Sequence, residues 1–212
     1  MAIAYVGLSA AATSTVTLPT FAAGDVAIVY AFRDGNVTPP SLPVGWTDIS
    51  SEALNTASHR FGYRVLIAAD TDTGTWTNAT EVEVMVLRGQ SAVTPIGDWT
   101  SDTTNNSNLI DYGGLTAMIR TDGTSLVAGF AAHRNATDVN AQTVSGMTIR
   151  SGSVGTMGAH TQANVTSFGT KGYQAVVNSS TGCWGSLTIE VVSSEWNNPR
   201  VGKMAYVSRG AR

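Results

Sequence analysis

The chain has 212 residues, of which 42% are hydrophobic and only 13% are charged, and its formal net charge is −3 at pH 7. Without an overall basic charge it shows no sign of nucleic-acid binding, and no apolar run reaches the roughly 18 residues of a membrane-spanning helix. Cys183 is its one cysteine, which excludes an internal disulfide and a zinc site built on cysteines.

The first residues, MAIAYVGLSAAATSTV, lack a basic region, and Gly7, Ser9 and Thr13 interrupt their apolar run. We interpret them as a strand and not as a signal peptide. The chain is thus expected to be soluble and made in a cytoplasm.

Strands are predicted along the whole chain, because Thr-rich segments with many Val and Ile residues suit a pleated sheet. Helical periodicity is weak even in the best candidate, residues 51–60. Turn-forming pairs such as Asp-Gly, Gly-Gly and Pro-Pro separate many short strands, which predicts an all-β antiparallel sandwich. The predicted strands cover residues 2–8, 14–18, 25–33, 60–69, 80–89, 107–112, 114–120, 124–132, 143–150, 153–167, 172–178 and 184–192.

Three strands have informative patterns. Residues 25–33 are apolar on both faces, which predicts a central strand. Residues 60–69 alternate, with Phe61, Tyr63, Val65 and Ile67 on one face. Residues 80–89 alternate too, which predicts inward-facing side chains at Val82, Val84 and Val86.

The two halves of the chain resemble one another. GDVAIVYAFRDGN (24–36) is similar to GTSLVAGFAAHRN (123–135), and EVEVMVLRG and GSLTIEVVS each close a half. Two sheets built from paired four-strand sets would give a jelly-roll-like sandwich.

The C-terminal residues differ in composition from the rest. We predict a β-sandwich domain over residues 1–192 and an extended C-terminal arm over residues 193–212. The arm combines apolar anchors with basic side chains, namely Trp196, Met204 and Tyr206 with Arg200, Lys203, Arg209 and Arg212. We expect it to lie on a neighbouring subunit, and a tail folded back on its own domain is the alternative.

Residues with catalytic or metal-binding chemistry are scattered. His59, His133 and His160 are far apart and have no metal-ligand spacing. Residues 70–81 outline a calcium loop, but Gly74 takes a ligand position and Thr75 the position that requires glycine. A polar hairpin is the better interpretation.

Glu81 and Glu83 stand two apart on one strand, a separation of about 6.6 Å that would suit glycosidic chemistry. Exposed sheet faces often carry such pairs. No catalytic, cofactor-binding or metal-binding residue is therefore predicted.

Four tryptophans adjoin turns or strand ends, where an amphipathic ring can cap a sandwich: Trp46, Trp76, Trp99 and Trp184. Capping is the preferred interpretation. The alternative is that Trp46, Trp76 and Trp99 are exposed and form a platform on which sugars stack.

Several motifs together resemble a known family. The stretches STVTLPTFAAGDVAIVYAFRDGNVTPPSLPVGWTDI, HRFGYRVLIAADTDTGTWTNATEVEVMVLRG and GCWGSLTIEVV resemble β-sandwich proteins found among bacteriophage virion proteins and some bacterial surface proteins. The shared motifs are Gly24-Asp25, residues 43–47 (Pro-x-Gly-Trp-Thr), residues 63–65 and residues 184–192. The resemblance covers about residues 1–192 and brings no catalytic residues.

The resemblance implies a non-enzymatic virion structural protein. It would decorate the outside of a capsid or tail, after synthesis in the host bacterial cytoplasm, and stabilise the assembly through inter-subunit contacts. Its partners would be other virion proteins and copies of itself, with a trimer as one common arrangement and with no cofactor, nucleic acid or membrane. The alternative is a carbohydrate- or receptor-binding module of a phage tail or fibre, with a host surface glycan as its ligand.

Overall fold

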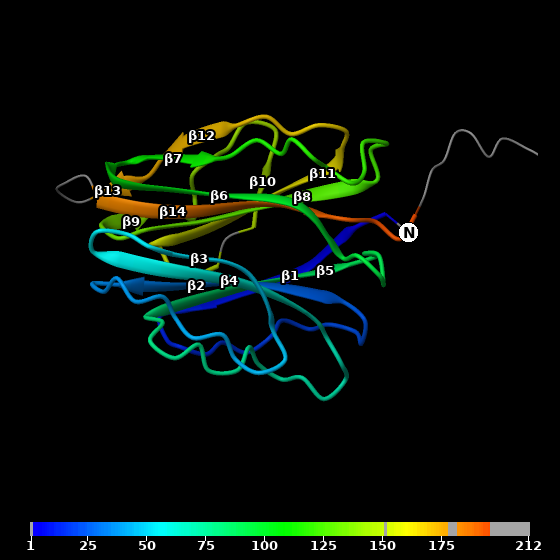
Figure 1. Cartoon of the computed structure of the whole chain (residues 1–212), viewed down its shortest axis with the longest axis horizontal. Helices are drawn as coiled ribbons and strands as arrows, with labels where there is room; N and C mark the ends of the chain where they lie inside the picture. The colour runs from blue at the N-terminus through cyan, green and yellow to red at the C-terminus, as the bar shows by residue number, and fades with distance from the viewer. Residues whose placement is uncertain (1, 151, 178–181, 196–212) are drawn as a thin grey trace, which may run out of the picture.

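Two five-stranded sheets packed face to face form the body of the protein (Figure 1). The computed structural model describes residues 2–150, 152–177 and 182–195. Every secondary-structure element within these residues is a β-strand, and every strand pair is antiparallel. The predicted all-β antiparallel sandwich is confirmed. No helix in the described part of the chain is long and apolar enough to cross a membrane.

The N-terminal half of the chain forms the first sheet and the C-terminal half forms the second. The first sheet has the order β1 (Ala4–Ala11), β5 (Glu81–Arg88), β2 (Val26–Asp34), β4 (Ala57–Val65) and β3 (Thr47–Ala53). The second has the order β10 (Thr148–Ile149), β11 (Met157–Val165), β8 (Ser125–His133), β14 (Gly182–Val191) and β6 (Ile96–Ser107).

The two sheets share one topology. In chain order, β1, β2, β3, β4 and β5 of the first sheet correspond to β6, β8, β10, β11 and β14 of the second, and each set pairs in the same order. The sequence similarity between the halves thus falls on equivalent strands, β2 with β8 and β5 with β14. Each half supplies five strands and not the four that we expected.

Two short ribbons are added in the second half. β7 (Leu109–Tyr112) pairs with β12 (Lys171–Gln174), and β9 (Ala136–Asp138) pairs with β13 (Val176–Val177). Figure 1 shows the β7–β12 ribbon above the second sheet and loops of the first half below the first sheet. Both sheets are therefore covered on their outer faces too.

The apolar residues fill three layers. Side chains from both sheets form the central core, including Tyr30, Phe61, Phe130 and Leu187. A second cluster lies between the first sheet and its loops, and a third between the second sheet and the β7–β12 ribbon. A strand buried on both faces is expected in such an arrangement, and β2 is buried from Val26 to Phe32. The predicted central strand is confirmed.

Several predicted details are wrong. Val65 and Ile67 are exposed, so the alternation of Phe61 and Tyr63 does not continue to the end of the segment. Val82, Val84 and Val86 face the outer cluster of the first sheet and not the central core. Residues 14–18 and 114–120 form no strand, and residues 51–60 belong to the β3–β4 hairpin.

Candidate functional site

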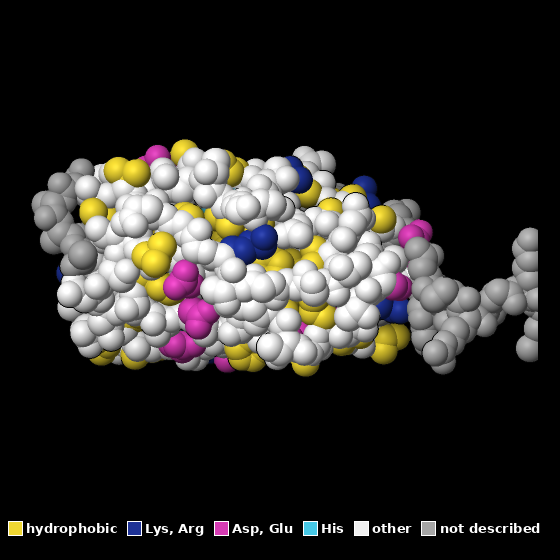
Figure 2. All heavy atoms as spheres, turned by 90° about the horizontal axis from the view of Figure 1, so that it is seen from above, with side chains coloured by type: hydrophobic (Ala, Val, Ile, Leu, Met, Phe, Trp, Pro, Cys, Tyr) yellow, Lys and Arg dark blue, Asp and Glu magenta, His cyan; other side chains and the backbone are white. Residues whose placement is uncertain are grey.

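A pocket of about 410 Å³ opens beside β6, β7 and β14. Figure 2, seen from the side of the β7–β12 ribbon, shows acidic side chains gathered toward one edge of this face. The pocket is lined mainly by carboxylates, hydroxyl groups and an indole, from Asp102, Asp111, Thr104, Ser107, Thr170 and Trp184.

Strand pairing places these residues together. Asp102 of β6 lies opposite Ser186 of β14, and Ser186 Oγ donates to the Asp111 carbonyl at 2.6 Å, which fixes β7 above the sheet. Thr104 lies opposite Trp184 in the same ladder. The pocket therefore lies where the ribbon leaves the outer face of β6 uncovered.

Two glycines make room for the carboxylates. A Cβ atom at Gly113 would clash with Asp102 Oδ2, and one at Gly172 would lie 2.8 Å from Asp111 Oδ1. Larger residues at these positions would displace the two acidic groups.

The carboxylates of the pocket repel one another. Burial raises the pKa of Asp102, and the negative charges of Asp111 and Glu52 raise this pKa further. Among the described residues, Asp102, Asp111 and Glu52 take part in no ion pair. Lys171 lies on the neighbouring β12, but its Nζ donates to the Ser145 carbonyl at 2.7 Å. The pocket therefore has unbalanced negative charge.

Trp184 contributes an unused hydrogen-bond donor. Its side chain lines the pocket although the residue is only 4% exposed. Its Nε1 is buried and has no hydrogen-bond partner. A buried donor without an acceptor costs free energy, so a shift of the ring that let a ligand's acceptor reach Nε1 would be favoured.

The chemistry of the pocket suits an extended polar or cationic ligand. Among the described residues no three His, Cys, Asp or Glu side chains are grouped so as to hold a metal ion.

The alternative platform of three tryptophans is wrong. Trp46 and Trp76 are 7% and 0% exposed and pack edge to face in the outer cluster of the first sheet, with ring centroids 5.5 Å apart. Trp99 is 43% exposed and lies on β6 of the other sheet. The three rings thus share no surface, and Trp46 and Trp76 cover their sheet as the capping interpretation expects.

The histidines are buried within the fold. His160 packs against two tyrosines that also contact each other. Its Nδ1 lies 2.9 Å from Tyr112 Oη, and Tyr112 Oη lies 3.4 Å from Tyr173 Oη. Burial lowers the pKa of His160 and raises the pKa of Tyr112 well above its usual value. His59 is buried without a partner for either ring nitrogen, and burial lowers its pKa to about 4.

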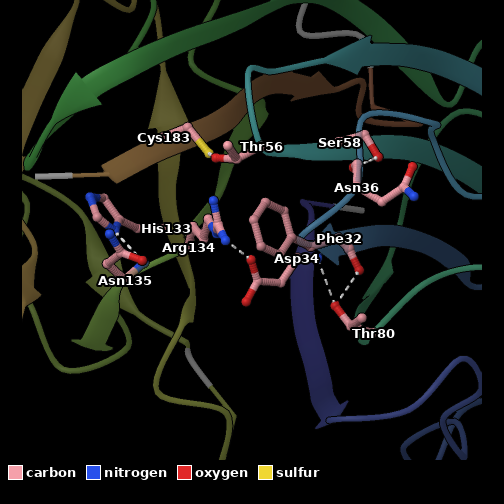
Figure 3. A network of polar contacts seen from close by, with 10 residues as sticks. All are labelled: Phe32, Asp34, Asn36, Thr56, Ser58, Thr80, His133, Arg134, Asn135 and Cys183. Carbon is pink, nitrogen blue, oxygen red and sulfur yellow. Dashed lines mark hydrogen bonds and ion pairs between the residues drawn. The ribbon is translucent and has the colours of Figure 1, made fainter.

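A polar network ties the sheets together where β2 and β8 end (Figure 3). Arg134 Nε donates to Asp34 Oδ1 at 2.7 Å, which links the second sheet to the first. Thr80 Oγ1 accepts from the Asp34 backbone N–H at 2.9 Å, and the Asn135 N–H donates to His133 Nδ1 at 3.1 Å. His133 thus lies at a strand end, as predicted.

The glutamates of β5 face the second half of the chain. Glu81 accepts a hydrogen bond from Thr156 Oγ1 at 2.6 Å, and Glu83 is 1% exposed. Burial raises the pKa of both carboxyls, that of Glu83 to about 8. Neither residue lines the pocket described above.

The loop over residues 70–81 is stabilised by its own polar groups. Asp72 Oδ1 accepts from the Gly74 N–H at 2.8 Å, and Asp70 forms an ion pair with Arg64 at 2.7 Å. These side chains hold turns of the backbone together. β4 and β5 on either side of the loop do not pair with each other, because β2 lies between them, so the hairpin interpretation is wrong.

The predicted arm residues lie outside the described residues: Trp196, Arg200, Lys203, Met204, Tyr206, Arg209 and Arg212. The described chain continues past the predicted boundary at Val192, because Ser193 pairs with Gln90 and the Ser194 N–H donates to the Gly89 carbonyl at 2.9 Å.

Sequence reasoning did not find the pocket. Trp184 is far from Asp102 and Asp111 in the chain, and β6 has the composition of a polar loop. No protein-family model, no curated protein and no solved structure matches the chain.

Proposed function

We propose that this chain is a non-enzymatic structural protein of a bacteriophage virion, which decorates the outside of a capsid or tail. Copies of the chain would bind one another, and neighbouring virion proteins, through the C-terminal arm. The phage context rests on the motifs at Gly24-Asp25, residues 43–47, residues 63–65 and residues 184–192.

The division of charge along the chain carries the proposal of self-assembly. Residues 1–195 contain eight Lys and Arg against fifteen Asp and Glu, a net charge of −7, whereas residues 196–212 contain four Lys and Arg and no acidic residue, a net charge of +4. Opposite charges on two parts of one chain favour association between copies and guide their encounter.

The mass of the protein in solution tests the proposal. We expect the full chain to be oligomeric at low salt and a chain that ends at Glu195 to be monomeric. Glu195 is a better end point than Val192 because Ser193 and Ser194 still pair with the sandwich. A full chain that is monomeric at low salt would contradict self-assembly.

The virion location needs its own experiment. Mass spectrometry of purified phage particles should find the chain in many copies, and an antibody against it should label the particle surface. Particles that lack the chain would contradict this part of the proposal.

Carbohydrate binding is the second candidate function, and the pocket beside β6 favours it. Carboxylates and hydroxyl groups such as those of Asp102, Asp111 and Thr104 are suitable partners for sugar hydroxyls. A glycan array probed with the wild type and with Asp102→Asn/Asp111→Asn would test it. Binding that the double substitution abolishes would support a receptor-binding module.

A further inference from the structure

In the proposed function the C-terminal arm, residues 196–212, binds another copy of the chain. The arm is positively charged, and the pocket beside β6, β7 and β14 is negatively charged. Asp102 and Asp111 line it, and Glu52 lies near enough for its charge to raise the pKa of Asp102. The described ion pairs of the sandwich involve other acids, namely Asp25, Asp34, Asp48 and Asp70. A cation placed between Asp102 and Asp111 would relieve their mutual repulsion.

Other features favour a peptide over a free ion. The Trp184 Nε1 is a donor without an acceptor, and a peptide carbonyl could supply one. β6 is an edge strand, which within the described part of the chain pairs with β14 alone, and such an edge can bind an additional extended segment. A peptide with basic side chains offers carbonyls, backbone donors and positive charge together.

We propose that the pocket beside β6, β7 and β14 receives a Lys or Arg side chain from residues 196–212 of a second copy of the chain. The inference rests on the proposed function, because it names the surface that the arm binds. An Arg side chain would donate two parallel hydrogen bonds to a carboxylate, the strongest form of such a contact. Hydroxyl groups such as Thr104 and Thr170 would form the rim around it.

A sugar satisfies these features less well. Sugar hydroxyls can donate to carboxylates, but a neutral ligand leaves the charges of Asp102 and Asp111 unbalanced. Trp184 is almost completely buried and therefore offers little ring surface for stacking. The cationic arm accounts for the charge, the unused donor and the edge strand.

The test uses full-length variants that change each side of the contact. The pocket variant is Asp102→Asn/Asp111→Asn, and the arm variant is Arg200→Gln/Lys203→Gln/Arg209→Gln/Arg212→Gln. The matched control is Asp72→Asn/Asp122→Asn, which changes the net charge as much as the pocket variant does. Both control residues are exposed and accept backbone hydrogen bonds that asparagine can also accept.

Analytical ultracentrifugation at low salt then measures association. We expect the pocket variant and the arm variant each to weaken association by about 100-fold or more, since two charge-assisted contacts are lost. The control variant should associate like the wild type. Circular dichroism should show that all variants retain the sandwich.

Mixing the two defective variants distinguishes a second copy from the same chain. The pocket variant still has an intact arm, and the arm variant still has an intact pocket. Association should therefore reappear in the mixture. Its failure to reappear, with both variants monomeric, would overturn the assignment to a second copy.

The remaining outcomes separate the inference from the proposed function. If only the arm variant dissociates, the arm binds elsewhere, so the inference is wrong and the proposed assembly stands. If only the pocket variant dissociates, the pocket binds something other than the arm, and the inference is wrong. The inference is also wrong if the pocket variant loses glycan binding but remains oligomeric, because the pocket then binds a glycan. If neither variant dissociates, assembly does not use the arm, and both proposals fail.

Discussion

Two buried carboxylates differ in the hydrogen bonds that they accept. Glu190 accepts four, from the backbone N–H groups of Asp98, Ile119 and Arg120 and from Ser125 Oγ. Glu83 accepts only one backbone bond, from Gly152 at 3.3 Å, and its Oε2 has no partner. Glu190 therefore links the loop before β8 to β14. Glu83 has too few hydrogen bonds to offset the free-energy cost of burying its carboxyl group.

We predict that Glu83 makes the protein less stable at alkaline pH. Burial raises its pKa from 4.5 to about 8, so the folded state binds this proton more tightly than the unfolded state. Its contribution to stability is complete below pH 4.5 and is lost as the pH rises through 8, a change on the order of 4 kcal/mol in unfolding free energy.

Glu83→Gln should remove this dependence. In urea unfolding the variant should match the wild type near pH 5 and be more stable near pH 9. Glu81, whose pKa is raised in the same direction, should leave a smaller dependence of the same sign. Parallel stability curves for the two proteins from pH 5 to 9 would contradict the prediction.

At the scale of the element, the sequence predicted best those strands whose own side chains are apolar on both faces. β2 was predicted almost to its ends, because its burial follows from its composition. β6 was missed because IGDWTSDTTNNS has few apolar residues, and only its ladder with β14 makes it a strand. Residues 14–18 have a strand-like composition, and Val16 and Leu18 are buried. They pair only with the loop before β5, through the isolated bridge between Thr17 and Asp72, and so form no strand. The pocket was missed for the same reason as β6, since Asp102 and Asp111 meet only through tertiary pairing.

The loop between β4 and β5 contains a buried tryptophan that packs against the first sheet. Trp76 is fully buried and packs against Trp46 and close to Gly62, where an added Cβ atom would lie 2.9 Å from its ring. Trp76→Ala should lower the free energy of unfolding by about 3–5 kcal/mol, because the cavity removes the contacts that hold this loop on the first sheet.

Trp99→Ala is the matched control, since the ring of Trp99 is 43% exposed on β6. This substitution should lower the free energy of unfolding by no more than about 1 kcal/mol. Urea unfolding followed by circular dichroism measures both variants without depending on tryptophan fluorescence. If the two substitutions lower the free energy of unfolding equally, Trp76 does not hold the loop on the sheet.

At the scale of the whole molecule, the two halves have the same topology and share the central core. The central core takes side chains from both sheets, such as Phe61 of β4 and Phe130 of β8. Tyr30 Oη also donates to the Gly185 carbonyl at 3.0 Å across the interface between the sheets. Each sheet therefore depends on the other to bury its inner face, although each comes from one continuous half of the chain.

We predict that the chain can be divided between Ala92 and Val93 and still assemble. The chain passes from the first sheet to the second in the connection between Arg88 and Ile96, and Val93 there is 92% exposed. Fragments 1–92 and 93–212, expressed together, should co-purify in equal amounts and unfold in one cooperative transition in urea. Each fragment alone should lack this transition, because the inner apolar face of its sheet would be exposed to water. A fragment that unfolds alone with the midpoint of the whole chain would show that the duplicated sheets are independent domains.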